Sequence, residues 1–248
     1  MTTIASTHNP RLKALRRLQT RRGRAADSRF LVEGEDLLDA ANAAGRPALE
    51  GYRLAGSDIG DDSFHDVEAA ALASVSTLGS STRAIAVYEQ RWQAPIGPLC
   101  VYLHGVGDPG NVGTVLRSAA AFGASCVAIG PGCADPYSPK AVRASMGAIF
   151  AVALARVGGP QELPGELVAL DARAEETLQG EIVGAEGAVT LLIGAERDGL
   201  PADVLAASDR TARIPIATES LNAAMATTVA LYEMTRRGSR DIDTFPAS

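Results

Sequence analysis

From residue 99 to the C-terminal helix, short apolar runs alternate with segments of helical character, and this alternation constrains the fold more than any other feature of the chain. Strands that alternate with helices in this way indicate a doubly wound α/β arrangement. The runs expected to form strands are residues 99–106, 126–129, 167–170, 189–194 and 212–216. Ligands of open parallel sheets bind beyond the carboxyl ends of the strands, so functional side chains are expected there.

A polar turn leads into a helix at residues 108–123, directly after the first run. With a rise of about 1.5 Å per residue, Asn111 and Arg117 lie roughly 9 Å apart along the helix axis, so one nucleotide fits between them. The alternative is that Asn111 is only an N-cap and Arg117 a solvated surface residue. The stripe expected to be buried is Val112, Val115, Leu116, Ala119, Ala120 and Phe122, with Gly113, Thr114, Arg117, Ser118 and Ala121 on the other side.

Two later segments also carry candidate polar groups. In residues 191–200, an apolar strand ends in a turn at Gly194, and Glu196 follows where a strand end meets a cleft. The alternative is that Glu196 is an exposed acid of the turn. In residues 213–222, Ser220 is expected to cap the final helix, residues 221–237, with Asn222 inside its first turn. Asparagine has only modest helix propensity, so an amide in the first turn is expected mainly where its side chain hydrogen-bonds another group. The small residues of 144–150 permit close backbone approach or simply tight packing.

The charge distribution separates the N-terminal part from the rest. The 248 residues carry a formal net charge of −6, which argues against nonspecific coating of nucleic acid. Residues 1–30 nevertheless hold eight basic residues against the single acid Asp27, a surplus that suits phosphate contacts. The alternative is a solvated basic helix without a partner. The basic residues are Arg11, Lys13, Arg16, Arg17, Arg21, Arg22, Arg24 and Arg29.

Residues 1–92 are expected to form a small α/β domain, and residues 93–98, rich in proline and glycine, a linker to the domain of residues 99–248. The three cysteines lack paired spacing and the three histidines are scattered, so we expect reduced thiols and no metal site. No apolar run is long enough for export or membrane insertion. A cytoplasmic protein is expected.

Four segments, taken together, resemble the successive motifs of the SpoU (TrmH-type) RNA ribose 2′-O-methyltransferases of the SPOUT superfamily. They are Asp-Pro-Gly-Asn-Val-Gly…Arg at 108–117, Ser-Met-Gly-Ala at 145–148, Gly-x-Glu-x-x-Gly-Leu at 194–200 and Ile-Pro-Ile…Ser-Leu-Asn at 214–222. The front part resembles the small ribosomal-protein-like domain that many members use to hold RNA, through Asn-Pro-Arg at 9–11 and Phe-Leu-Val-Glu-Gly at 30–34. The resemblance therefore covers nearly the whole chain.

The resemblance implies a SPOUT α/β fold with a C-terminal trefoil knot, S-adenosyl-L-methionine as cofactor, and a homodimer in which the partner completes each active site. A guanidinium has a pKa above about 12, so we expect Arg117 to brace a phosphate and stabilise a developing alkoxide rather than to remove a proton. Members of the family commonly have glycine at the position of Arg197. We therefore expect Arg197 either to alter the loop over the cofactor or to add a phosphate contact. Implied roles are catalytic for Arg117, Asn111, Glu196, Ser220 and Asn222, cofactor-binding for Gly194, Ile214 and Leu221, and RNA-binding for Arg11, Lys13, Arg16, Arg17, Arg21 and Arg22.

The expected activity is methyl transfer to a ribose 2′-hydroxyl of ribosomal RNA, 23S rRNA in particular, with transfer RNA as the nearest alternative substrate. A noncatalytic RNA-binding or ribosome-assembly factor is a second hypothesis, against which the joint presence of the five catalytic-type residues speaks. A nicotinamide enzyme is a third, and it lacks the Gly-x-Gly-x-x-Gly fingerprint after its first strand.

Overall fold

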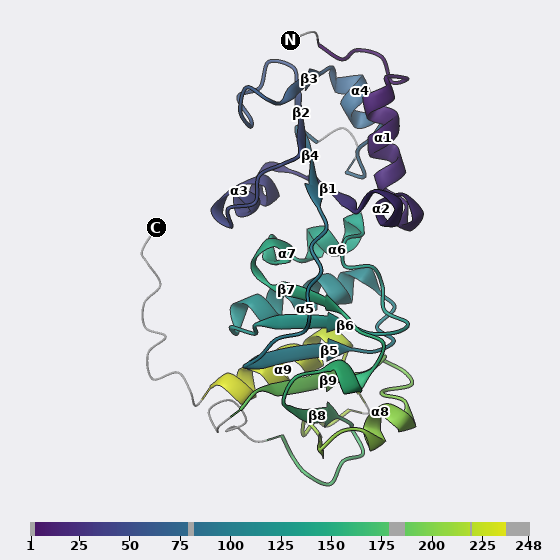
Figure 1. The fold of residues 1–248 in the computed structure, drawn as a ribbon, viewed down its shortest axis with the longest axis vertical. Coiled ribbons are helices and arrows are strands. Elements are labelled where there is room, and N and C mark those ends of the chain that lie inside the picture. The colour runs from purple at the N-terminus through teal and green to yellow at the C-terminus, as the bar shows by residue number, and fades with distance from the viewer. Residues whose placement is uncertain (1–2, 79–81, 179–186, 219, 237–248) are drawn as a thin grey trace. The chain divides into compact units, whose positions relative to one another are not determined.

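The computed structural model describes residues 3–78, 82–178, 187–218 and 220–236, which form two compact units (Figure 1). The first unit comprises Met1–Arg91 together with Asp135–Ala151, and the second comprises Trp92–Ala134 and Val152–Ser248. The chain therefore passes from one unit to the other three times. No helix among the described residues is long and apolar enough to cross a membrane.

A four-stranded sheet forms the centre of the first unit, in the order β1-β4-β2-β3. Strand β4 runs antiparallel to both β1 and β2, whereas β2 and β3 are parallel. The strands are β1 (Arg29–Glu33), β2 (Glu50–Leu54), β3 (His65–Val67) and β4 (Ala84–Glu89). The helices of this unit are α1 (Pro10–Leu18), α2 (Arg21–Asp27), α3 (Glu35–Ala43), α4 (Ala69–Ala73), α6 (Pro139–Ala144) and α7 (Ala148–Ala151).

Helix α1 begins where its sequence provides a start signal: the Asn9 side chain accepts a hydrogen bond from the Arg11 backbone N–H, and Pro10 occupies the first helical position. Leu12, Leu15 and Leu18, spaced at three-residue intervals, are buried in the core of the unit. Burial of this stripe leaves the basic side chains of α1 on the outer face.

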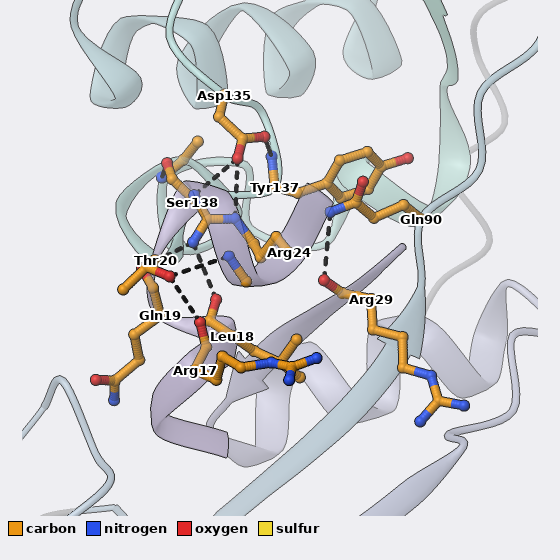
Figure 2. Close-up of polar contacts among 12 residues, drawn as sticks. Arg17, Leu18, Gln19, Thr20, Arg24, Arg29, Gln90, Asp135, Tyr137 and Ser138 are labelled. Atoms are coloured by element: carbon orange, nitrogen blue, oxygen red, sulfur yellow. Dashed lines mark hydrogen bonds and ion pairs between the residues drawn. The ribbon is translucent and has the colours of Figure 1, made fainter. Parts of the chain in front are cut away.

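Arg24 departs from the expectation that it belongs to the accessible basic surface, because it is only 3% exposed. Its Nε and Nη2 atoms donate to Asp135 Oδ2 at 2.9 and 2.7 Å, and its Nη1 donates to the carbonyl oxygens of Leu18 and Gln19 at 3.0 and 2.8 Å (Figure 2). The guanidinium thus satisfies the end of α1 and fixes the segment at Asp135, and it is withdrawn from any phosphate.

An aromatic cluster anchors the two ends of Asp135–Ala151 within the first unit. Phe30 of β1 packs against Tyr137, with ring centroids 4.7 Å apart, and Tyr88 of β4 packs edge-on against Phe150 at 4.9 Å. Aromatic pairs at such distances add specific packing energy to the burial of their area. The core of the first unit therefore depends on residues distant in sequence.

A six-stranded parallel sheet, in the order β10-β8-β9-β5-β6-β7, forms the second unit. The alternating pattern predicts the parallel α/β arrangement and five of these strands, but not β7. All residues of β5 and β9 are buried, which is typical of strands covered on both faces. The strands are β5 (Leu99–Leu103), β6 (Cys126–Ile129), β7 (Ala153–Arg156), β8 (Glu166–Leu170), β9 (Val189–Ile193) and β10 (Arg210–Ala212). The remaining elements of this unit are α5 (Pro109–Ala121), η2 (Pro160–Glu162), α8 (Ala202–Ala206) and α9 (Ala223–Thr235).

Strand β10 ends at Ala212, whereas the strand was expected to continue to residue 216. Pro215 has no N–H to donate to a strand ladder, so the chain leaves the sheet before reaching it. The expectation that residues 214–216 are part of the strand is therefore wrong, and Arg213 forms only an isolated parallel bridge with Thr177.

Helices α5 and α9 pack against each other, which alters the buried face expected for α5. Ser118 of α5 is buried, and its hydroxyl shares a hydrogen bond of 2.6 Å with the Thr228 hydroxyl of α9. Phe122 contacts Tyr232 edge-on, with centroids 6.2 Å apart. Gly113 is likewise buried and Ala120 exposed, so the expected stripe is wrong at these three positions while Val112, Val115, Leu116 and Ala119 are buried as expected.

Candidate active site

Three polar side chains that are far apart in the sequence meet in one cluster of the second unit. Asn111 Nδ2 donates to Glu196 Oε1, and Asn222 Nδ2 donates to Asn111 Oδ1 at 3.1 Å and to Glu196 Oε1 at 3.3 Å. Asn111 comes from the first turn of α5, Glu196 from the loop after β9, and Asn222 from the residue before α9. The cluster ties together the starts of both helices and the end of a central strand.

Local capping explains how two of these amides are held. Asn222 is the N-cap of α9, and its Oδ1 accepts from the backbone N–H groups of Ala224 at 3.0 Å and Met225 at 3.3 Å. The expectation that Ser220 caps this helix with Asn222 inside the first turn is therefore wrong. The single amide has both functions because its oxygen caps the helix while its nitrogen donates to the cluster.

Asn111 does not cap α5, because Asp108 does so by accepting a hydrogen bond from the Asn111 backbone N–H at 3.0 Å. Pro109 occupies the first helical position, which suits a residue without an N–H. The side-chain amide of Asn111 is thereby free to bond Glu196 and Asn222. The alternative in which Asn111 serves only as a cap is wrong.

A cavity of about 380 Å³ opens beside the cluster, where the carboxyl ends of β8, β9 and β10 lead into loops. It lies at the edge of a parallel sheet, where ligands commonly bind. Its walls come from residues 170–173, 193–200 and 212–214 and from Ile216, Ser220, Leu221, Ala223 and Ala226. Five residues with an expected role line it: Gly194, Glu196, Ile214, Ser220 and Leu221. Asn111, Arg117 and Asn222 are not among the lining residues.

Gly194 is required by the tight loop at the end of β9. A Cβ at this position would lie 2.2 Å from the carbonyl carbon of Gly199 and 2.4 Å from the nitrogen of Leu200. The loop is closed by two backbone hydrogen bonds between Ala195 and Gly199, at 2.9 and 3.1 Å, and Gly199 has a φ of +67°. Backbone groups therefore approach the cavity closely, without side chains between them.

Charged groups of both signs surround the cavity. Partial burial acts to raise the pKa of Asp171, but hydrogen bonds from the side chain and backbone of Arg173 outweigh it and hold this pKa below its usual value. Arg197 and Arg213 add cations, and Ile193 and Leu200 supply apolar wall. The arrangement suits a ligand that combines an apolar ring with charged groups of both signs.

Arg117 is exposed on α5, six residues after Asn111, and within the described part of the chain it has no hydrogen-bond or ion-pair partner. It is available to a ligand or to a second polypeptide. Among the described residues there is also no group of three His, Cys, Asp or Glu side chains that could hold a metal ion.

The basic residues of the first unit differ in how far they are already engaged. Arg11 pairs with Glu50 at 3.7 Å, and Arg17 pairs with Asp27. Arg16 donates to the Thr7 carbonyl and the Ser74 hydroxyl. Among the basic residues of the N-terminal segment, the exposed cations whose side chains have no partner in the described structure are Lys13, Arg21, Arg22 and Arg29.

Sequence reasoning missed Asp171 and Arg173, although Asp171 is the first residue after an apolar run expected to be a strand. The rule that places sites beyond the carboxyl ends of parallel strands would have singled it out. Arg173 follows the same strand end, lines the cavity and pairs with Asp171 at 3.2 Å.

Comparison with known proteins gives a consistent result. A sequence profile described as the SpoU rRNA Methylase family matches residues 98–232. An uncharacterised tRNA/rRNA methyltransferase of Synechocystis is 31% identical over 94% of this chain and 93% of its own. The 23S rRNA (guanosine(2553)-2′-O)-methyltransferase of Bacillus subtilis is 26% identical over 94% of this chain and 99% of its own. The crystal structure of the AdoMet-bound rRNA methyltransferase from Sinorhizobium meliloti has a TM-score of 0.82 at 28% identity, covering 96% of this chain and 98% of that one.

Proposed function

The chain belongs to the SpoU rRNA methylase family, and from this we propose that it methylates a ribose 2′-hydroxyl of ribosomal RNA, 23S rRNA in particular. The protein is an RNA methyltransferase of the SpoU class with S-adenosylmethionine as its cofactor. The observation that carries the proposal is the convergence of Asn111, Glu196 and Asn222 beside a cavity at the carboxyl edge of the parallel sheet.

The cavity fits this cofactor. Its volume of about 380 Å³ lies within the range of small-molecule sites, roughly 300 to 1,000 Å³. Ile214 and Leu221 would offer apolar contacts to an adenine ring, and the backbone around Gly194 would approach it without side chains intervening. The paired Asp171 and Arg173 would serve the ammonium and carboxylate of the amino-acid part.

Bound S-adenosylmethionine supplies an electrophilic methyl group on a sulfonium centre. The protein must therefore hold the ribose hydroxyl in line and stabilise the negative charge that develops on its oxygen. We assign this stabilisation to Arg117, whose guanidinium keeps its proton and also braces a neighbouring phosphate. Glu196, held by the two amides, fixes the loop, and the exposed Ser220 hydroxyl is placed to bond substrate.

We propose that the enzyme acts as a homodimer, and exposed apolar residues on α9 support this. Met225, Val229 and Tyr232 are 62%, 42% and 52% exposed and follow one another at i, i+4 and i+7, which forms a stripe along one face of the helix. The opposite face, including Thr227 and Leu231, is buried. Because Arg117 does not line the cavity of its own chain, a partner protomer would complete the active site with it.

Three finer assignments belong to the same proposal. Residues 1–92 would hold RNA, residues 93–98 would link the two domains, and residues 99–248 would catalyse, with residues 135–151 packed into the first unit. The exposed and unpaired Lys13, Arg21 and Arg22 support the first assignment. A trefoil knot would be formed by the segment around residues 213–236, which leaves the edge strand β10 and returns to α5. An RNA substrate of this kind would place the enzyme in the cytoplasm.

Transfer of tritiated methyl groups to purified 23S rRNA, 16S rRNA and tRNA tests the proposal, with the alkali-resistant linkage mapped by nuclease digestion. We expect one 2′-O-methylated site in 23S rRNA. Methylation of tRNA alone would overturn the substrate assignment. RNA binding without methyl transfer to any RNA would identify a noncatalytic factor instead.

A further inference from the structure

The first unit contains a cavity of about 600 Å³ that none of the residues assigned above lines. Its walls are the exposed side of α3, residues 47–48, the loop of residues 58–64, and Tyr88 of β4. Four carboxylates line it, and no Lys, Arg or His does: Glu35, Asp39, Asp58 and Asp61. The cavity is acidic in a unit whose N-terminal segment is strongly basic.

The wall formed by residues 58–64 is fixed by its own packing. The Phe64 ring lies against Gly51 of β2 and against Gly60 of the loop, so a Cβ would come within 2.4 Å of the ring at Gly51 and 2.7 Å at Gly60. Gly60 also has a φ of +74°, a conformation that other residues rarely adopt. The buried Phe64 therefore sets the shape of the cavity, which does not depend on its occupant.

The four carboxylates differ in how far their charge is already balanced. Glu35 pairs with Arg83 at 2.9 Å. Asp61 accepts hydrogen bonds from the side chain and backbone of Ser63, which lower its pKa and keep it ionised. Asp39 and Asp58 have no hydrogen-bond or ion-pair partner among the described residues, so at least two negative charges remain uncompensated.

Tyr88 gives an independent indication of a ligand. Its side chain is 2% exposed and lines the cavity, yet its hydroxyl has no hydrogen-bond partner among the described residues. Burial raises the pKa of Tyr88 to about 12, so the phenol stays neutral and its oxygen can accept an N–H. Among the described residues the Tyr88 oxygen is not one of the fully buried side-chain atoms that lack a partner, so part of its surface faces open space. The open space that Tyr88 lines is this cavity, where the oxygen is accessible to a ligand.

We propose that this cavity binds an aliphatic polyamine. The ammonium groups lie against Asp39, Asp58 and the Tyr88 oxygen, while the methylene segments between them cover the apolar wall of Leu38 and Phe64. The ligand combines charged groups with apolar segments, as the lining of the cavity combines carboxylates with apolar side chains. A divalent metal does not, because no group of three described carboxylates is close enough to coordinate one.

Isothermal titration of the full chain with spermidine at 0.15 M salt tests the proposal. We expect saturable binding of one spermidine, unaffected by Mg²⁺ at constant ionic strength. Because an exposed charge pair contributes modestly, Asp39→Asn and Asp58→Asn should each weaken binding about two- to fivefold. The matched control is Asp36→Asn on the same helix but outside the cavity, which should leave affinity unchanged.

Tyr88→Phe removes only the hydroxyl and should also weaken binding severalfold, with thermal unfolding measured alongside to verify that the variant folds. The two aspartate variants test the site regardless of that outcome, because both side chains are exposed. Absence of saturable heat would overturn the proposal. Equal effects of Asp36→Asn and Asp39→Asn, or displacement by Mg²⁺, would show diffuse charge attraction in its place.

Discussion

Substitutions of Asn222 separate the two functions of its amide, which caps α9 through its oxygen and holds the active-site cluster through its nitrogen. Asn222→Ala removes both. Loss of the cap costs about 1 kcal/mol. Loss of two exposed side-chain hydrogen bonds adds about 1 kcal/mol in total. For a chain of this size, about 2 kcal/mol corresponds to a decrease in Tm of roughly 4 to 8 °C.

Asn222→Ser and Asn222→Asp keep a capping oxygen, so each should lower the Tm by no more than roughly half of that. Both lose the N–H donors, and the aspartate sets a carboxylate against Glu196. Methyl transfer should therefore fall in both variants although α9 remains capped. Like charges at this distance favour a shared proton, so the aspartate variant should regain activity as the pH falls, because a protonated carboxyl can donate as the amide does.

The assay combines differential scanning calorimetry with initial rates of methyl transfer at saturating cofactor, between pH 5.5 and 8.5. Wild-type activity in the aspartate variant at pH 8 would refute a role for the donated hydrogen bonds. A serine variant that melts as low as the alanine variant would refute the capping contribution.

Four further substitutions test other parts of the structure. Arg117→Ala should reduce methyl transfer at least about 100-fold, as removal of a charge-stabilising donor does, with cofactor affinity by calorimetry unchanged. Gly194→Ala should abolish cofactor binding in the same calorimetric titration, because its Cβ would lie 2.2 Å from an opposing carbonyl carbon. Val229→Asp should convert dimers to monomers in light scattering, because it charges the apolar stripe. Arg24→Met should destabilise the first unit by about 3 to 5 kcal/mol in urea unfolding, because Asp135 keeps a largely buried charge without its partner.

Each of these has a matched control and a contrary outcome. Arg213→Ala, an exposed cavity arginine outside the proposed catalytic set, should spare turnover more than Arg117→Ala; equal losses would remove the special role of Arg117. Gly107→Ala, whose Cβ would have its nearest neighbour, a backbone oxygen, at 4.0 Å, should leave cofactor binding intact. Glu233→Ala should leave the oligomer unchanged, and a dimeric Val229→Asp would contradict the interface. Arg22→Met should leave stability unchanged, and an equally small effect of Arg24→Met would contradict the buried ion pair.

The sequence predicts the parallel sheet of the second unit well, because continuous apolar runs such as those of β6 and β9 follow from burial on both faces. It predicts less well where a partner distant in sequence decides the outcome. Ser118 is buried because Thr228 of α9 provides its hydrogen bond, and Arg24 is buried because Asp135 neutralises it. Neither partner is visible from local periodicity.

Capping at α9 shows a further limit. Ser220 and Asn222 are both good capping residues, so propensity alone does not choose between them. The structure places the helix start at Ala223, where the Asn222 amide can also reach Asn111 and Glu196. The tertiary cluster thus decides the cap, and the helix boundary follows from it.

The membership of Asp135–Ala151 in the first unit has a consequence for how the protein is made. Translation delivers Phe30 and Tyr88 more than forty residues before their aromatic partners Tyr137 and Phe150. The N-terminal unit therefore cannot finish folding on the ribosome until β5, α5 and β6 have emerged. A separate fragment of residues 1–91 would contain Phe30 and Tyr88 but lack Tyr137 and Phe150. The N-terminal part of the chain is therefore not an independent folding unit.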